Sequence, residues 1–175
     1  GFDKSWRKQA AKELNPGTVL DLGSGTGASY SDLKNFDVTA LDPDEKMLSL
    51  NNFKKKVVGI GEELPFKENS FDNVLCCFVW RNMSDTEKAL SEVYRVLKPG
   101  GKFILLDMTR PKNFFLKLLH KIGTFALLHF VGFITFNLKE YRFLYESLDF
   151  YPQPEDHLTE DKYENLLIHR ILNFL

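Results

Sequence analysis

A glycine-rich loop with an acidic residue on either side is the part of the sequence with the clearest chemistry. Gly23, Gly25 and Gly27 follow a run of aliphatic residues, and Asp21 lies two residues before the first of these glycines. Asp42 follows about 20 residues downstream, where an acidic residue can hydrogen-bond the hydroxyl groups of a ribose. Because glycine lets the backbone turn tightly and come close to a ligand, the loop predicts a nucleotide-type binding site.

The charge of Asp21 favours one kind of cofactor over another. A carboxylate at this place would repel a pyrophosphate but attract an ammonium group, and S-adenosylmethionine carries an ammonium and a sulfonium but no phosphate. An ion pair at about 4 Å gains roughly 4 kcal/mol at an effective dielectric constant of about 20, before the cost of desolvation. We therefore expect S-adenosylmethionine as the cofactor. Two alternatives stay open: Gly23, Gly25 and Ala28 also fit the dinucleotide pattern of a dehydrogenase, and a glycine turn can bind nothing.

A second polar group follows two later apolar runs. Arg81 and Asn82 come directly after one such run, and Asp107 ends another. The carboxyl ends of parallel strands meet at one edge of a sheet, so these side chains should face the same site. Arg81 could stabilise a developing anion there, and Asp107 could act as a base. The alternatives are structural: an ion pair of Arg81, for example with Asp85, and a solvated acidic residue at the end of a strand.

The elements that must position these residues alternate between strand and helix. Strands are predicted at residues 18–22, 38–41, 56–60, 71–78 and 102–108, and helices at 4–14, 26–35, 44–52 and 86–97, with Asp44 and Asp85 as helix caps. This alternation predicts an α/β, Rossmann-like fold, a mostly parallel central sheet with helices on both faces. Farther along, residues 114–136 indicate one or two amphipathic helices, and residues 165–172 a sixth strand.

Length and composition exclude several classes of protein. The 175 residues suit one domain, and a net charge of −1 gives no electrostatic case for nucleic acid. Cys76 and Cys77 are adjacent, so we expect no disulfide between them and no zinc finger, and the four histidines have no metal spacing. We expect no metal, no signal peptide and a cytoplasmic protein. The apolar stretch of residues 122–136 is too short to span a bilayer.

Several segments of the first 110 residues resemble class I methyltransferases. Residues 19–27 (VLDLGSGTG) look like their first motif, residues 63–66 (ELPF) and 69–72 (NSFD) like the loop before their fourth strand, and residues 94–101 (YRVLKPGG) like the turn into their fifth. The resemblance implies a class I methyltransferase fold that binds S-adenosylmethionine.

A narrower resemblance is to the ubiquinone/menaquinone biosynthesis C-methyltransferases. Residues 78–85 (FVWRNMSD) are similar to that family's F-G-x-R-N-x-x-D signature, and residues 110–112 (RPK) and 141–147 (YRFLYES) resemble it too. One departure is Ile60, which stands where the family usually has an aspartate that contacts adenine; Glu62 or Glu63 could take that part.

The narrower resemblance implies methyl transfer to a ring carbon of a polyprenylated quinol precursor. Arg81 would then act on the phenol oxygen and Asn82 on a quinol oxygen, while Tyr141 and Tyr145 would line a lid. The residues expected at the cofactor are Asp21, Gly23, Ser24, Gly25, Gly27, Asp42, Pro43, Met47, Gly61, Glu62 and Phe78.

The same resemblance gives a single domain with a cofactor-binding core at residues 1–110, a helical lid at 111–150 and a C-terminal segment at 151–175. The Phe-rich residues 114–136 are expected either as a lid packed on the sheet or as an apolar wall or membrane-surface contact for an isoprenoid tail. The expected partner is a lipophilic small molecule. The alternatives are a methyltransferase for a sterol, phospholipid headgroup or hydroxylated aromatic, and a non-catalytic binding or assembly protein.

Overall fold

The computed structural model describes residues 2–108, 113–134, 142, 145–146, 166–167 and 170–171. The chain divides into two compact units. The first comprises Gly1–Asp107 with Leu158–Arg170, and the second Met108–His157 with Ile171–Leu175. The glycine loop and both groups of candidate site residues up to Asp107 therefore belong to the first unit.

A seven-stranded sheet forms the framework for the candidate site. Its strands are β1 (Thr18–Leu22), β2 (Asp37–Asp42), β3 (Lys55–Val58), β4 (Phe71–Cys77), β5 (Leu97–Met108), β6 (Leu166–Leu167) and β7 (Arg170–Ile171). The order is β3-β2-β1-β4-β5-β6, every pair along it is parallel, and β7 pairs with β5. The predicted α/β, Rossmann-like class is confirmed. The strand order reverses between β1 and β4, and ligands of such sheets bind at the carboxyl edge beside that point.

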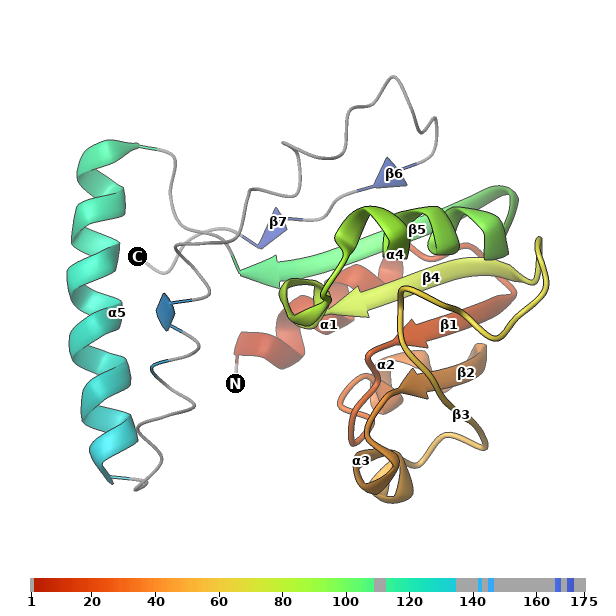
Figure 1. Ribbon diagram of the computed structural model, residues 1–175, viewed down its shortest axis with the longest axis horizontal. Helices are drawn as coiled ribbons and strands as arrows, with labels where there is room; N and C mark the ends of the chain where they lie inside the picture. The colour runs from red at the N-terminus through yellow and green to blue at the C-terminus, as the bar shows by residue number, and fades with distance from the viewer. Residues whose placement is uncertain are drawn as a thin grey trace. The chain divides into compact units, whose positions relative to one another are not determined.

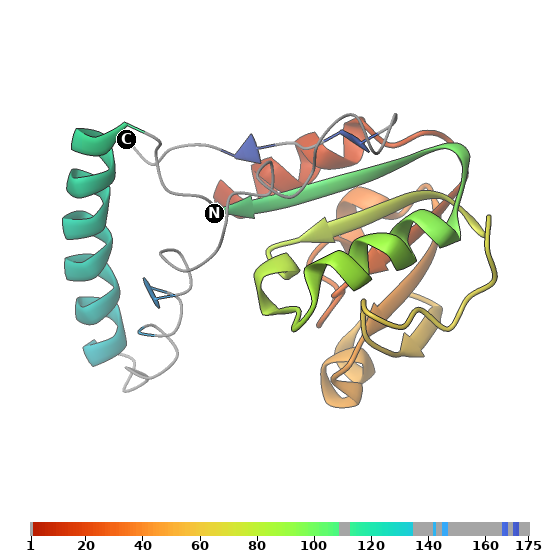
Figure 2. The same ribbon diagram turned by 45° about the horizontal axis from the view of Figure 1, so that its top comes forward.

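Continuous apolar runs build the central strands because both faces of the sheet are covered. Leu20, Val74, Leu75, Ile104 and Leu106 are completely buried. Figure 1 shows why: α1 (Phe2–Lys12) lies behind the sheet and α4 (Thr86–Val96) lies in front of it, and Figure 2 shows the same arrangement from another angle. α2 (Tyr30–Leu33) packs against α1.

Two acidic residues begin helices, as predicted. The Asp44 carboxylate accepts hydrogen bonds from the amides of Lys46 and Met47 at the start of α3 (Glu45–Leu50). The Asp85 carboxylate accepts one from the amide of Lys88 in α4, at 2.9 Å. Such caps satisfy amide groups that have no partner within the helix.

Some predicted boundaries are wrong. The helix predicted from residue 26 begins only at Tyr30, because Gly27 takes a left-handed φ of 85° and its amide closes a turn on the Ser24 carbonyl. The strand predicted from residue 102 already begins at Leu97, which pairs with Phe71 before a register shift. Of the sixth strand predicted over residues 165–172, the described residues form two short strands, β6 and β7.

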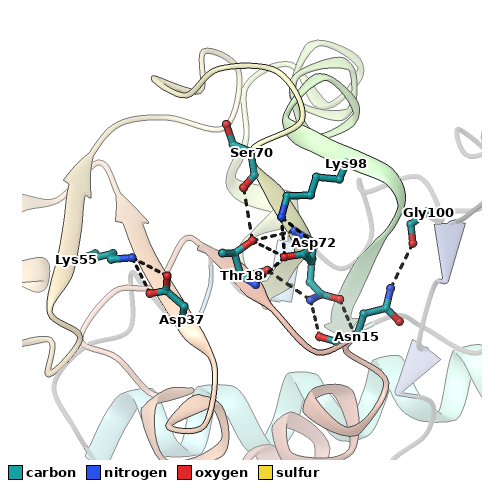
Figure 3. A network of polar contacts seen from close by, with 9 residues as sticks. Asn15, Thr18, Asp37, Lys55, Ser70, Asp72, Lys98 and Gly100 are labelled. Carbon is teal, nitrogen blue, oxygen red and sulfur yellow. Dashed lines mark hydrogen bonds and ion pairs between the residues drawn. The ribbon is translucent and has the colours of Figure 1, made fainter.

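A polar network joins the amino ends of β1, β4 and β5 (Figure 3). The Asp72 carboxylate accepts hydrogen bonds from the amide and hydroxyl of Thr18, each at 2.8 Å, and forms an ion pair with Lys98 at 2.9 Å. The Thr18 amide first, and then Lys98, hold the pKa of Asp72 at about 2. Two of the segments that resemble methyltransferase motifs, NSFD and KPGG, thus bind each other at the edge away from the glycine loop.

The second unit contains α5 (Phe114–Ile134), a single helix that continues through Gly123. Phe114 is 82% exposed and Phe115 71%, and four further residues on the same side are exposed: Leu118, Leu119, Ile122 and Phe125. The Phe125 ring lies 5.5 Å from the ring of Tyr145. Among the described helices, none has the length and apolar character needed to cross a bilayer. Tyr141 and residues 110–112 lie outside the described residues.

Candidate active site

The glycine loop follows the carboxyl end of β1 and is hydrogen-bonded to the carboxyl end of β2. The amides of Gly23 and Ser24 both donate to the carbonyl of Leu41, at 2.8 and 3.0 Å. The amide of Gly25 donates to Asp42 Oδ2 at 2.8 Å, and the other carboxylate oxygen accepts from the Asp44 amide at 2.9 Å. The loop and the acidic residue predicted for ribose recognition are therefore brought together at one edge.

Asp21 is a buried carboxylate at the same edge, with 2% of its surface exposed. Its Oδ2 accepts a hydrogen bond of 2.6 Å from the Ser24 hydroxyl, and that hydroxyl accepts one of 2.8 Å from the Asn51 amide group. Burial raises the pKa of Asp21 to about 6, although the Ser24 hydrogen bond and the charge of Arg7 lower it. A buried carboxyl group whose pKa lies near neutral pH is well placed to bind a cationic group.

Close contacts explain why the loop needs glycine. A Cβ atom at Gly23 would lie 2.4 Å from Val79 Cγ1, and one at Gly27 would lie 2.7 Å from Asn51 Oδ1. Gly25 has a φ of 52° but faces more open space, with the sulfur of Met47 3.8 Å from the position of a Cβ. Sequence reasoning missed Asn51, which also donates to the Gly25 carbonyl at 3.1 Å. Its position just after α3 carries no motif.

Phe78 directly follows β4 and has a left-handed φ of 63°, which is rare for a residue with a large side chain. The Arg7 guanidinium lies 5.0 Å from the centre of its ring, and the Trp6 ring lies 6.4 Å away. Arg7 also donates a hydrogen bond of 3.2 Å to the Ser29 hydroxyl. Sequence reasoning missed Arg7 as well, because one arginine on an amphipathic helix carries no motif.

Arg81 and Asp107 form an ion pair at the carboxyl ends of β4 and β5. Arg81 Nη2 lies 3.0 Å from Asp107 Oδ1, and only 6% of each side chain is exposed. From the sequence, Asp85 was the example of an ion-pair partner for Arg81. In the structure, the partner of Arg81 is Asp107. Within the described part of the chain, the buried Arg81 Nη1 has no hydrogen-bond partner. Asn82, in the η1 turn (Trp80–Asn82), is exposed.

The segment expected near adenine has an apolar and a polar part. Ile60 is 46% exposed and bridges to Glu63. Glu62 is buried, and its Oε1 accepts hydrogen bonds from the amide and hydroxyl of Ser84 at 2.7 and 3.0 Å. Burial works against ionisation of Glu62, but hydrogen bonds from its own amide, from Ser84 and from Asp85 lower its pKa overall. Glu62 thus braces the loop against the start of α4.

The remaining residues expected at the cofactor follow β2 and β3. Pro43 and Met47 are exposed beside Asp42, and a Cβ at the buried Gly61 would lie 2.9 Å from the Met83 side chain. The thiols of Cys76 and Cys77 are free and buried. Burial raises the pKa of Cys77 to about 12 and that of Cys76 well above its ordinary value, so neither thiol is an available nucleophile at neutral pH.

The strand order, the glycine loop after β1 and the acidic residues at the ends of β1 and β2 define a class I, Rossmann-like methyltransferase. A solved S-adenosylmethionine-dependent methyltransferase from Thermotoga maritima has a similar structure, with a TM-score of 0.54 and 33% identity over 59% of this chain and 51% of that one.

The family is narrower than this class. The model of the ubiE/COQ5 methyltransferase family matches residues 1–162, and the chain belongs to that family. It is 33% identical to the ubiquinone/menaquinone biosynthesis C-methyltransferase UbiE of Rickettsia felis, over 89% of this chain and 71% of that protein. It is 35% identical to the demethylmenaquinone methyltransferase of Thermus thermophilus, over 89% of this chain and 78% of the relative. The protein is an S-adenosylmethionine-dependent methyltransferase.

Proposed function

We propose that this protein methylates a ring carbon of a prenylated quinol precursor in quinone biosynthesis. The observation that carries the proposal is the buried Arg81–Asp107 pair, which lies at the carboxyl edge of the sheet in a chain of this family. The names of the Rickettsia and Thermus relatives support the same substrate class.

The residues at the carboxyl edge fit S-adenosylmethionine. We assign the ammonium group to Asp21, whose buried carboxylate favours a cation, and the ribose hydroxyls to Asp42. The exposed apolar side chains of Ile60 and Met47 suit the adenine ring. Their apolar contact takes the place of the acidic contact to adenine that is usual in the family. Gly25 lets the backbone approach the ligand. Glu62 acts indirectly, since it shapes the loop around Gly61. When bound, the cofactor supplies an electrophilic methyl group on a sulfonium.

Arg81 is the residue to which we assign the chemistry on the substrate side. Its guanidinium stabilises the phenolate oxygen that makes the adjacent ring carbon nucleophilic. The proton of the methylated ring carbon passes to a water that Arg81 orients through its N–H donors. Asp107 holds Arg81 with one oxygen at 3.0 Å, which suits a positioning residue better than a base. The exposed Asn82 amide hydrogen-bonds a second quinol oxygen.

The apolar surface of α5 suits a lipophilic substrate. The helix contains no acidic residue and exposes Phe114, Phe115, Leu118 and Ile122. Burying each methylene of a prenyl tail on such a surface gains about 0.8 kcal/mol. We assign to α5 and Tyr145 a lid or tail-binding role, as well as transient contact with a membrane surface. Flotation with liposomes should carry the protein into the lipid fraction; recovery only in the aqueous fraction would contradict this contact.

A turnover assay tests the proposed function. The protein is incubated with methyl-labelled S-adenosylmethionine and a short-chain demethylmenaquinol, and the product is analysed by mass spectrometry. We expect a label on a ring carbon, loss of turnover in Arg81→Ala, and normal turnover in a variant of the exposed Lys46. Turnover that is unchanged in Arg81→Ala would remove Arg81 from the chemistry, and a label on oxygen would contradict C-methylation.

A further inference from the structure

Arg7 reaches from α1 to the carboxyl edge of the sheet, at the reversal point between β1 and β4. Its Nη1 donates to the hydroxyl of Ser29, and its guanidinium lies over the ring of Phe78. Phe78 follows the last residue of β4 and keeps a left-handed backbone, with its amide bonded to the Leu106 carbonyl at 2.7 Å. Ser29 and Phe78 thus fix the guanidinium from two different elements.

The same edge holds the buried Asp21, so it offers one positive and one negative group. The charge of Arg7 favours the ionised form of Asp21, which burial disfavours. Arg7 Nε is buried and, among the residues that the structure describes, has no hydrogen-bond partner. A buried donor of this kind is costly unless a ligand atom accepts its hydrogen bond.

We propose that Arg7 binds the α-carboxylate of the cofactor's amino-acid end, while Asp21 binds its ammonium group. This inference rests on the proposed function, because it requires S-adenosylmethionine as the ligand. The planar guanidinium has donors that match the two oxygens of a carboxylate. A site with both charges selects the zwitterion, and it discriminates against adenosyl compounds that lack the carboxylate.

The competing explanation is structural. Arg7 could serve only to fasten α1 to the loop that carries Ser29, with no contact to the ligand. Both explanations expect an Arg7 variant to bind the cofactor more weakly, so a loss of affinity alone cannot separate them. A ligand that differs only in the carboxylate can.

Calorimetric titration with two ligands makes the comparison. The first ligand is S-adenosylhomocysteine, and the second is its decarboxylated analogue, which keeps the amine, thioether and adenosine. The unchanged protein should bind the first about 10- to 100-fold more tightly, as expected for a charged hydrogen-bonded pair. Arg7→Met should lose that factor for S-adenosylhomocysteine and keep the affinity for the analogue. Arg7→Lys should restore part of the difference, and Lys8→Met, on the same helix and exposed, should behave as the unchanged protein.

Each other outcome is decisive. Equal losses for both ligands in a folded Arg7→Met, checked by thermal unfolding, would make Arg7 a structural residue and overturn the inference. Equal affinities of the unchanged protein for both ligands would overturn it too. Absence of binding of either ligand to the unchanged protein would instead contradict the proposed cofactor, so the two failures are distinguishable. If Arg7→Met does not fold, the Arg7→Lys variant and the ligand comparison on the unchanged protein still decide the matter.

Discussion

Arg81 Nη2 lies 3.0 Å from Asp107 Oδ1, with 6% of each side chain exposed. The two residues come from different elements: Arg81 lies in η1, which follows β4, and Asp107 lies one residue before the end of β5. Taking two charges out of water is costly, and the pair persists only while each charge neutralises the other. The arrangement holds a guanidinium in place at the edge where the cofactor is expected.

The ion pair gives the first prediction. Asp107→Asn leaves the Arg81 charge buried and uncompensated, so we expect a loss of about 3 kcal/mol in the free energy of unfolding. The double variant Arg81→Met/Asp107→Leu should lose much less than the sum of its two single variants. Urea denaturation of the unchanged protein, of the single variants Arg81→Met and Asp107→Leu, and of the double variant measures this coupling. Additive losses would mean that the two side chains do not depend on each other.

Asp21 gives the second prediction, which concerns stability and pH. Its pKa is about 6 in the folded protein against 3.8 as the ordinary value, so the folded state binds the proton more tightly. Stability therefore falls as pH rises from about 4 to about 6, and the loss of about 3 kcal/mol remains above that range. Asp21→Asn should be more stable than the unchanged protein at pH 8 by up to this amount, and equally stable at pH 4.

The same variant should be unable to bind the cofactor well. Without the carboxylate, the ammonium group of S-adenosylhomocysteine has no counter-charge, so we expect affinity to fall by at least about tenfold. In the unchanged protein, affinity should rise between pH 5 and pH 7, as Asp21 ionises with its pKa of about 6. A variant that is less stable at pH 8, or that binds with normal affinity, would contradict the role given to Asp21.

Asp72 provides the opposite pH dependence at the other edge of the sheet. Its pKa is lowered from 3.8 to about 2, so the stability it contributes is fully present above pH 3.8 and is lost as pH falls through about 2. We expect Asp72→Asn to lose about 2 kcal/mol at pH 7 and almost nothing at pH 2. Denaturant titrations at both values measure the effect. Affinity for S-adenosylhomocysteine should stay normal, and a weaker affinity would mean that this network also shapes the site.

A pair of glycine substitutions tests the geometry of the loop. A Cβ at Gly27 would lie 2.7 Å from Asn51 Oδ1 and would require a left-handed φ of 85°. We expect Gly27→Ala to lose at least about 1–2 kcal/mol of stability and to weaken cofactor binding. Gly123→Ala in α5, where nothing lies within 4 Å of the new atom, should gain up to about 1 kcal/mol. Thermal unfolding of both variants shows whether the loss of stability is specific to the loop. Equal losses in Gly27→Ala and Gly123→Ala would mean that any glycine substitution destabilises the protein.

The parts of the fold that the sequence predicted are those with local causes. The carboxylates of Asp44 and Asp85 cap helices through amides two or three residues away, so the signal and its effect lie in the same short segment. The strand at residues 18–22 was predicted to the residue because it is a buried aliphatic run that ends at glycine.

The errors and omissions come from contacts between distant segments. The early start of β5 depends on the pairing of Leu97 with Phe71, and the partner of Arg81 lies on another strand. Asn51 and Arg7 contribute through Ser24 and Ser29, more than 20 residues away in each case. No local pattern carries information on such partners, although the predicted parallel sheet made the meeting of Asp21, Asp42 and Arg81 at one edge predictable.

Calorimetric titration of the unchanged protein at pH 7.5 with S-adenosylhomocysteine and, separately, with NAD tests the central claim most directly. The buried Asp21 carboxylate at the glycine loop predicts saturable binding of the adenosyl amino acid and no detectable heat with the dinucleotide. Tight binding of NAD together with no heat from S-adenosylhomocysteine would contradict the assignment of the site.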